Sequence, residues 1–216
     1  LLGSTPEVRS ITGSNALSLI AIDQDKDVFV NLKRLVNPLG SESFIHGDWL
    51  SAPCGKVDVI IGDGALNMLH PSFHEAFFQR LHSLLSDNGH AVLRIHLSAP
   101  AAFANPQEVF RWYREEKPPG GLFTATRTHL DMLWMDQGSG MIDFEDYNNR
   151  IARLHTQGIV SQEEMSCYSR LFDVNKIKLF YIEKALLELL SNKWFDLLGT
   201  FRGGTIHAMT SILSSC

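Results

Sequence analysis

Four short apolar runs in the first hundred residues constrain this chain more than any other feature of its sequence. They are LSLIAI at 17–22, SFIHG at 43–47, VDVIIG at 57–62 and HAVLRIHL at 90–97. Leu1-Leu2-Gly3 reads as the end of an earlier run of the same kind. Each run has the length of a buried strand, and the stretches between them carry the apolar repeat of helices. Strands that alternate with helices build a parallel sheet that is covered on both faces.

Residues that cap helices and form turns mark the boundaries between these elements. A side-chain acceptor or a proline favours a helix start, and glycine favours a helix end. The paired Ser and Glu of a capping box mark the helix before the fifth strand. Thr5-Pro6 predicts the start of the first helix and Gly13 its end, and Asp25 predicts the start of the second. The capping box is Ser72-x-x-Glu75, and Asp87-Asn88-Gly89 predicts a turn.

The chain beyond residue 103 has a different, mostly helical pattern. Helices are expected to begin at Asn105-Pro106 and to cover 144–155 and 161–172, and Pro118-Pro119-Gly120-Gly121 interrupts them. A further amphipathic helix at 181–190 precedes two strands, 195–201 and 206–213, which would form a hairpin. We therefore expect one α/β domain with a Rossmann-like, seven-stranded, mostly parallel sheet whose last strand is antiparallel. Its parts would be a ligand-binding half at 1–102, a helical insertion at 103–178 after the fifth strand, and a closing segment at 179–216.

Composition and charge exclude several classes of protein. The chain has 216 residues, of which 44% are hydrophobic and 20% charged, which is ordinary globular usage. Its net charge of −5 argues against a general nucleic-acid binder. It has no apolar run of the roughly 20 residues that span a bilayer, and its first residues do not resemble a signal peptide. Three widely spaced cysteines predict a reducing cytoplasm, and the missing initiator Met suggests further chain upstream.

Polar residues follow each of the first four strands, where a parallel sheet binds its ligands. The first loop, Gly3-Ser4-Thr5-Pro6-Glu7, is neither G-x-G-x-x-G nor a P-loop. Pro6 lacks an N–H and Glu7 adds a negative charge, so the loop is poorly suited to a phosphate. These two residues argue against NAD, FAD and ATP.

Three acidic residues at the later strand ends are candidates for binding a nucleoside. Asp23, about 20 residues past Gly3, can accept both hydroxyl groups of a ribose. Asp48 can accept from an exocyclic amine while Trp49 stacks on a purine, and Asp63 lies in a Gly-Asp-Gly turn. The ordinary alternative for Asp23 is a helix cap. For Asp48 and Trp49 it is a turn aspartate beside a core tryptophan, and for Asp63 a tight strand-to-helix turn.

Taken in order, these segments resemble a class I S-adenosylmethionine (SAM)-dependent methyltransferase. The resemblance rests on LLGSTPEVRSI, IAIDQD, FIHGDWL, VDVIIGDGALNML and LSDNGHAVLRIHL. It covers residues 1 to about 100 and resumes at 180–216, where the family has a helix and a closing hairpin. The family's first motif departs here, with Leu1 in place of the acid and Thr5 and Glu7 in place of two glycines. A Gly-x-Thr-Pro-Glu form of this kind resembles that of uncharacterised small-molecule methyltransferases.

The resemblance implies SAM as cofactor and assigns roles to these residues. Gly3, Ser4 and Thr5 would line the methionine part, and Asp23 with Gln24 the ribose. Asp48 and Trp49 would meet the adenine. Asp63, Gly64 and Ala65 would lie beside the methyl-transfer locus. The expected function is methyl transfer to a small molecule.

The sequence does not assign a catalytic base. His70, Asn67 and His96 are candidates, with a loop or turn role as the alternative for the first two. His70 and His74 have helical zinc-ligand spacing, but Pro71 lies between them, so we expect no metal site. The acidic run Asp131, Asp136, Asp143, Glu145 and Asp146 is either solvated surface or a feature that favours a cationic substrate.

Two further functions stay open at this point, together with the assembly state. One is a methyltransferase-like module that binds a nucleoside-type ligand or a protein without catalysis; the other is a dinucleotide-dependent reductase. Residues 103–178 are expected to act as a lid that supplies acceptor contacts from Trp112, Tyr113 or Trp134, with glycines at 120–121 and 138–140 as hinges. No nucleic-acid or membrane partner is expected, and a homodimer is left open.

Overall fold

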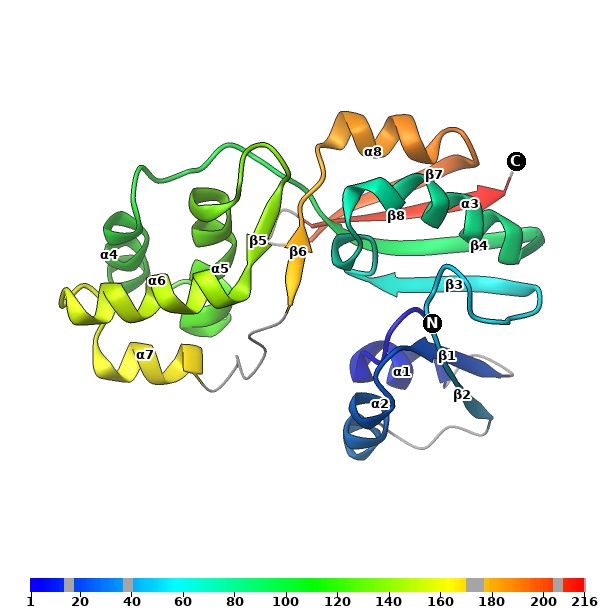
Figure 1. Ribbon diagram of the computed structural model, residues 1–216, viewed down its shortest axis with the longest axis horizontal. Helices are drawn as coiled ribbons and strands as arrows, with labels where there is room; N and C mark the ends of the chain where they lie inside the picture. The colour runs from blue at the N-terminus through cyan, green and yellow to red at the C-terminus, as the bar shows by residue number, and fades with distance from the viewer. Residues whose placement is uncertain (14–17, 37–40, 170–176, 204–207, 216) are drawn as a thin grey trace. The chain divides into compact units, whose positions relative to one another are not determined.

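The computed structural model describes residues 1–13, 18–36, 41–169, 177–203 and 208–215 (Figure 1). The chain divides into two compact units. The sheet unit comprises Leu1–Ile95, Ala185–Arg202 and Ala208–Cys216, and the helical unit comprises His96–Lys184 and Gly203–His207.

The sheet unit follows the alternating pattern of its sequence. Helix α1 begins at Pro6 as the capping signal predicts, and the Asp25 side chain caps α2 by accepting from the Val28 amide at 2.9 Å. The elements of this unit are α1 Pro6–Gly13, β1 Leu19–Asp23, α2 Lys26–Leu32, η1 Lys33–Leu35, β2 Glu42–His46, β3 Val57–Asp63, η2 Leu66–Met68, η3 Pro71–Phe73, α3 His74–Leu84, β4 Leu85–His96, α8 Lys184–Ser191, β7 Phe195–Gly203 and β8 Ala208–Ser215.

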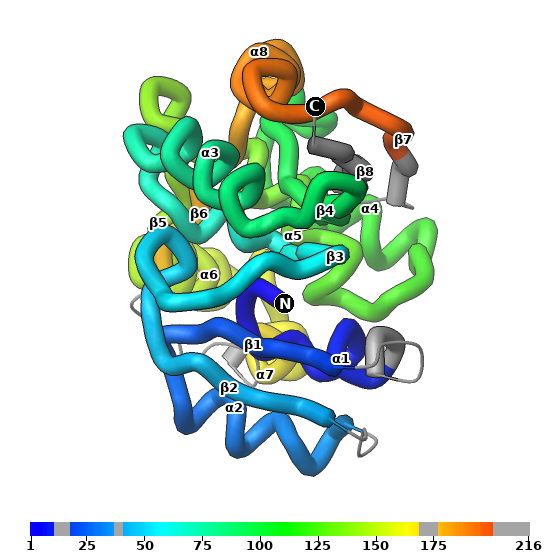
Figure 2. Tube along the Cα trace, turned by 90° about the vertical axis from the view of Figure 1, so that its right-hand side faces the viewer, coloured from blue at the N-terminus to red at the C-terminus, as the bar shows by residue number. Residues whose placement is uncertain are grey.

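The strands lie in the order β2-β1 and β3-β4-β8-β7, with Leu2 between the two groups (Figure 2). Leu2 makes one parallel bridge to Ile22 of β1 and another to Gly62 of β3. The expected seven-stranded sheet is therefore wrong as stated, because the named strands form a two-stranded and a four-stranded sheet. The antiparallel sense of the last strand stays a prediction.

The connectivity creates a point at which the chain's strand order reverses. Leu2, β1 and β2 succeed one another in one direction across the sheet, and β3 and β4 succeed one another in the opposite direction. All five segments are parallel, so their carboxyl ends share one edge. Ligands of open α/β sheets bind at this edge where the order reverses, which here lies between Leu2 and β3.

Two local predictions in the sheet unit are wrong. The capping box at Ser72 and Glu75 does not open a helix; the 3₁₀ helix η3 comes first, capped by His70, and α3 begins at His74. The predicted turn at 87–89 lies inside β4, where the pairing shifts from Val57–Leu85 to Val59–His90. Pairing with β3 on both sides of these residues turns them into an irregularity of the strand rather than its boundary.

A buried arginine joins three elements of the sheet unit. Arg9 of α1 is 0% exposed and donates through Nε and Nη2 to the two carboxylate oxygens of Glu42, at 2.7 and 2.8 Å. Its Nη1 donates to the Phe29 carbonyl at 3.2 Å, and the guanidinium lies 4.2 Å from the centre of the Phe29 ring. Because Glu42 is in β2 and Phe29 in α2, this one side chain ties α1 to the far edge of the sheet.

The helical unit consists of helices around a two-stranded antiparallel sheet. Reciprocal hydrogen bonds confirm the Ser161-x-x-Glu164 box, since the Glu164 amide donates to Ser161 Oγ and the Ser161 amide donates to Glu164 Oε2. Asn105 caps its helix by accepting from the Glu108 amide at 3.0 Å. The elements are α4 Pro106–Glu116, α5 Gly121–Trp134, β5 Met141–Asp143, α6 Phe144–Thr156, α7 Gln162–Ser169 and β6 Lys178–Phe180. The helix expected at 181–190 begins only at Lys184, as α8.

The packing around Gly140 requires a glycine at this position. Gly140 has a φ of +68°, and a Cβ at this position would lie 2.3 Å from the Tyr181 carbonyl oxygen. The Tyr181 amide donates to the Gly140 carbonyl at 2.8 Å. These contacts favour a tightly packed turn over the expected hinge.

The described residues contain no helix that is long and apolar enough to cross a bilayer. Cys54 and Cys167 are both free thiols.

Candidate functional site

The residues that pair at the reversal point form an apolar row across five parallel segments. Leu2 lies between Ile22 and Gly62, Ile22 pairs with Ile45, and Gly62 pairs with Leu93. At Gly62 an added Cβ would come within 2.9 Å of Leu93 Cδ2. The glycine at this position therefore serves close packing inside the sheet unit, not the approach of a ligand.

One residue further along each segment, the row becomes polar. Asp23 pairs with His46 on one side, Asp63 pairs with Arg94 on the other, and Gly3 follows Leu2 between them. The row therefore reads His46, Asp23, Gly3, Asp63, Arg94. Neighbouring strands lie about 4.8 Å apart, so Asp23 and Asp63 are separated by about 10 Å across the reversal point.

Gly3 supplies an open centre to this polar row. Its φ of +92° lies in the region that favours glycine. Its amide donates to the Ile22 carbonyl at 2.9 Å, which holds the turn against β1. Gly3 therefore places no side chain between the two carboxylates.

Asp23 is half-buried and held from two directions. The Ser4 hydroxyl donates to Asp23 Oδ2 at 2.6 Å, and the Asp25 amide donates to Oδ1 at 3.1 Å. Ser4 itself is 4% exposed. Each carboxylate oxygen still has acceptor capacity, so the carboxylate is fixed in place and able to accept further hydrogen bonds.

The residues beside Asp23 form its edge of the site. Gln24 is exposed, and its carbonyl accepts from His46 Nε2 at 2.8 Å. His46 was not singled out from the sequence, because only the register of β1 with β2 places it beside Asp23. Thr5 is half-buried, and its carbonyl accepts the Arg9 amide at 3.1 Å at the start of α1.

Asp48 and Trp49 both have structural partners. Asp48 Oδ1 accepts from the Leu50 amide at 2.7 Å, as expected for an aspartate that forms a turn. The indole N–H of Trp49 donates to the Ile22 carbonyl at 2.8 Å, and a Cβ on Gly3 would lie 3.9 Å from Trp49 Cζ2. Trp49 is half-buried and lies against the glycine turn, so its ring borders the centre of the row.

The loop after β3 closes the other side of the row. Asp63 forms an ion pair through Oδ1 with Nε of Arg94. Gly64 has a φ of +67°, and its amide donates to the Arg94 carbonyl at 2.9 Å. Ala65 is 2% exposed and belongs to the core.

The start of α1 carries the features that weigh against a phosphate. Pro6 is the first residue of this helix, and Glu7 places a carboxylate in its first turn. Pro6 has no N–H to donate, and a carboxylate repels a phosphate at the helix end that would otherwise attract one. The loop fits a ligand whose contact here is not a phosphate.

No protein-family model and no curated protein matches this chain. Among solved structures, a SAM-dependent methyltransferase from Methanosarcina mazei is similar at 11% identity and a TM-score of 0.55, covering 99% of this chain and 90% of its own. The N-methyltransferase NodS from Bradyrhizobium japonicum, solved with S-adenosylhomocysteine (SAH), is similar at 10% identity and a TM-score of 0.51, covering 99% and 75%.

A third structure carries a different description. A Zn-dependent alcohol dehydrogenase from Rhodobacter sphaeroides is similar at 11% identity and a TM-score of 0.60, covering 100% of this chain and 82% of its own. At these identities the likeness shows the fold. The chain has an α/β fold of the Rossmann-like kind found in SAM-dependent methyltransferases.

The candidate bases have structural partners of their own. His70 Nδ1 accepts from the Ser72 amide at 3.3 Å, so in the neutral ring the proton resides on Nε2. Asn67 is fully buried, and His96 lies at the end of β4 with its ring 5.8 Å from that of Tyr181. His70 thus acts as a helix cap, in line with the loop alternative.

His74, four residues on, is a core histidine. It is 1% exposed, and Nε2 contacts the Leu69 carbonyl at 3.1 Å. Burial is the main cause that lowers the pKa of His74, which favours the neutral ring. No group of three or more His, Cys, Asp or Glu suited to a metal occurs among the residues that the structure describes.

The main polar cluster of the helical unit is buried. Asp131 is 0% exposed; its Oδ2 accepts from the Tyr181 hydroxyl and lies 3.5 Å from Arg127 Nε. Burial raises the pKa of Asp131 to about 6, against a smaller lowering by Arg127. Thr126 and Tyr168 share a second buried hydrogen bond nearby. These groups hold α5, α7 and the segment after β6 together.

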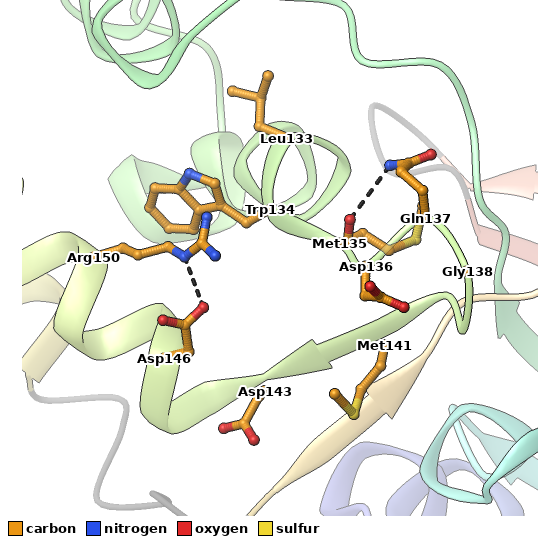
Figure 3. A pocket seen from close by; sticks show the side chains of 10 residues that line it. All are labelled: Leu133, Trp134, Met135, Asp136, Gln137, Gly138, Met141, Asp143, Asp146 and Arg150. Carbon is orange, nitrogen blue, oxygen red and sulfur yellow. Dashed lines mark hydrogen bonds and ion pairs between the residues drawn. The ribbon is translucent and has the colours of Figure 1, made fainter.

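The helical unit also has a hollow of about 490 Å³, which Figure 3 shows from close by. Three carboxylates border it, and each has a local partner. Asp136 accepts from the amide and hydroxyl of Ser139, Asp143 caps α6, and Asp146 pairs with Arg150 at 2.7 Å. These three acids of the run stabilise turns and a helix at the surface, in line with the solvated-surface alternative, but that alternative is wrong for Asp131, which is buried. The hollow is lined by Leu133, Trp134, Met135, Asp136, Gln137, Gly138, Met141, Asp143, Asp146 and Arg150.

Aromatic residues proposed as acceptor contacts pack within the helical unit. Trp134 lies edge-on to Tyr147 at 4.8 Å, and Trp112 lies edge-on to His129 at 5.0 Å. Tyr113 packs against the hydrophobic core. These contacts give each aromatic ring a structural role.

Proposed function

We propose that this chain transfers a methyl group from SAM to a small-molecule acceptor. The observation that carries the proposal is the polar row at the reversal point. Two carboxylates about 10 Å apart flank a glycine with positive φ, and one of the two is fixed by a buried serine. This arrangement suits a nucleoside lying across the strand ends.

The charge and donor pattern favours SAM over a dinucleotide. Asp23 offers acceptors to the two ribose hydroxyls, a role that an acid takes at this place in Rossmann-like sheets. Pro6 and Glu7 weaken phosphate binding at the start of α1. SAM carries a ribose and no phosphate, so it fits both features.

Different residues at this edge of the sheet would contact different parts of SAM. Gly3, Ser4 and Thr5 would lie along the methionine part, Asp23 and Gln24 along the ribose, and Asp48 and Trp49 along the adenine. Asp63 and the backbone of Gly64 and Ala65 would border the place where the acceptor meets the methyl group.

The chemistry asks little acid–base work of the protein. The sulfonium of SAM supplies an already activated methyl group. What the chain's own residues must do is align the acceptor in line with the departing bond and keep water away. A rigid row of strand ends with fixed carboxylates provides such alignment.

Calorimetry with SAH, NADH and NADPH tests this proposal. We expect SAH to bind one-to-one and both dinucleotides to give no heat. Binding of a dinucleotide without binding of SAH would contradict it and favour the reductase, the alternative supported by the likeness to the dehydrogenase structure.

The second alternative is a module that binds a nucleoside-type ligand without catalysis. Thr5 and Glu7, which stand where the family has glycines, favour it. Transfer of a radioactive methyl group from SAM to a fraction of small metabolites separates the two. Catalysis predicts labelled product, whereas a binding module gives SAH affinity and no product.

A further inference from the structure

Arg94 ends the polar row on the side away from Asp23. It is the register partner of Asp63, and its side chain is 53% exposed while that of Asp63 is 15% exposed. The ion pair between them uses Nε of the guanidinium and Oδ1 of Asp63. Arg94 is therefore paired through Nε, and about half of its side chain is exposed to solvent.

The outer end of Arg94 has the geometry of an anion site. Within the part of the chain that the structure describes, its Nη groups make no hydrogen bond to another residue. A planar guanidinium presents its donors in a fork that matches a carboxylate or phosphate. The pair with the largely buried Asp63 carboxylate restricts the orientation of the guanidinium.

The position of Arg94 in the row indicates which molecule carries the anion. Arg94 lies two strand spacings, about 10 Å, from Gly3 and three spacings, about 14 Å, from Asp23. The residues proposed to bind the nucleoside lie at Gly3 and at the ends of β1 and β2. Arg94 lies beyond β3 on the other side, where an acceptor would be placed.

We propose that Arg94 binds a carboxylate or phosphate group of the methyl acceptor and that Asp63 positions its guanidinium. The inference rests on the proposed function and specifies its substrate class as an anionic small molecule. The carboxylate in the methionine part of SAM offers the same chemistry, so the test has to separate the two sources.

The test uses the SAH-saturated protein with inorganic phosphate and benzoate as probes, and benzamide as the neutral match of benzoate. Binding is followed by chemical shifts, and Arg94→Gln is compared with Arg34→Gln, an exposed arginine of the same unit. We expect phosphate or benzoate to bind the wild type and Arg34→Gln equally, and Arg94→Gln at least about tenfold more weakly. Benzamide should not bind at this site.

Three results would overturn the inference. The first is that neither anion binds the wild type, and the second is that Arg94→Gln binds them as well as the wild type. The third concerns SAH and 5′-methylthioadenosine, which lacks the amino-acid part. If Arg94→Gln weakens SAH and spares methylthioadenosine, the arginine binds the cofactor's carboxylate instead. Failure of the wild type to bind SAH is a separate outcome, which removes the proposed function itself.

Discussion

The two units place their polar side chains in opposite ways. The sheet unit aligns Asp23, Asp63 and Arg94 along an edge, where they are partly exposed. The helical unit places Asp131 and Tyr181 in its core, where the Tyr181 hydroxyl donates to the Asp131 carboxylate. Polar groups at an edge keep hydrogen-bonding capacity for a ligand, whereas those in a core use it to hold helices together. The difference supports the proposal that the sheet unit binds the ligand and that the buried cluster stabilises the helical unit.

The largest expected effect concerns Arg9, the buried charge of the sheet unit. Arg9→Ala leaves Glu42 without its bidentate partner, and removing one partner of a buried pair costs about 3–5 kcal/mol of unfolding free energy. Urea denaturation measures this loss. The double variant Arg9→Met with Glu42→Met removes both charges and should recover most of it. An unchanged midpoint in Arg9→Ala would contradict the role of this arginine.

The next effect concerns Asp131 and depends on pH. Its pKa of about 6 lies above its ordinary value of 3.8. Between these values the folded state holds a proton that the unfolded state has lost, so stability falls as pH rises through this window, by about 3 kcal/mol in all. Asp131→Asn should therefore be more stable than the wild type at pH 7, by about 2–3 kcal/mol, and should lose this dependence.

Denaturation at pH 4.5 and 7.5 measures the Asp131 effect, with the exposed Glu116→Gln as control. The control should keep the wild-type dependence. If Asp131→Asn keeps it too, the buried carboxylate is not its source.

A comparable effect on binding is expected at the edge. Asp23→Ala should weaken SAH by about 1.5–3 kcal/mol, roughly 10- to 150-fold, because a charged acceptor of the ribose hydroxyls is lost. Stability should change little, since this side chain lies at a strand end. Calorimetry compares it with Asp27→Ala, an exposed acid of α2. Equal SAH affinity in Asp23→Ala and the wild type would place Asp23 outside the site.

The smallest effect concerns Ser4, which orients Asp23. Ser4→Ala removes the 2.6 Å hydrogen bond to Oδ2 and should weaken SAH by about 0.5–1.5 kcal/mol. The exposed Ser83→Ala serves as control. An effect on affinity larger than that of Asp23→Ala would mean that Ser4 contacts the ligand itself.

Local signals in the sequence predicted much of the fold. Asp25, Asn105 and the Ser161-x-x-Glu164 box cap helices as expected, because these interactions span only a few residues. The three-residue strands β5 and β6 were missed, since they are too short to show a period. Residues 202–204, expected as the hairpin turn, lie partly outside the described residues.

Interactions that depend on distant pairing could not be predicted. Arg9 meets Glu42 across 33 positions, and an arginine in a short helix reads as a surface residue. The strand-end acids Asp23 and Asp63 were found because parallel strands end at one edge. That His46 and Arg94 complete their row depends on a register that one residue would change.

The account's central claim is that the sheet edge, and not the helical core, binds the nucleoside. Amide chemical shifts recorded with and without SAH test it most directly. We predict that the largest changes fall at Gly3, Ser4, Asp23, Trp49 and Gly64, and that Asp131 and its neighbours on α5 keep their positions. Changes confined to residues 96–184, or no change at saturating SAH, would contradict the claim.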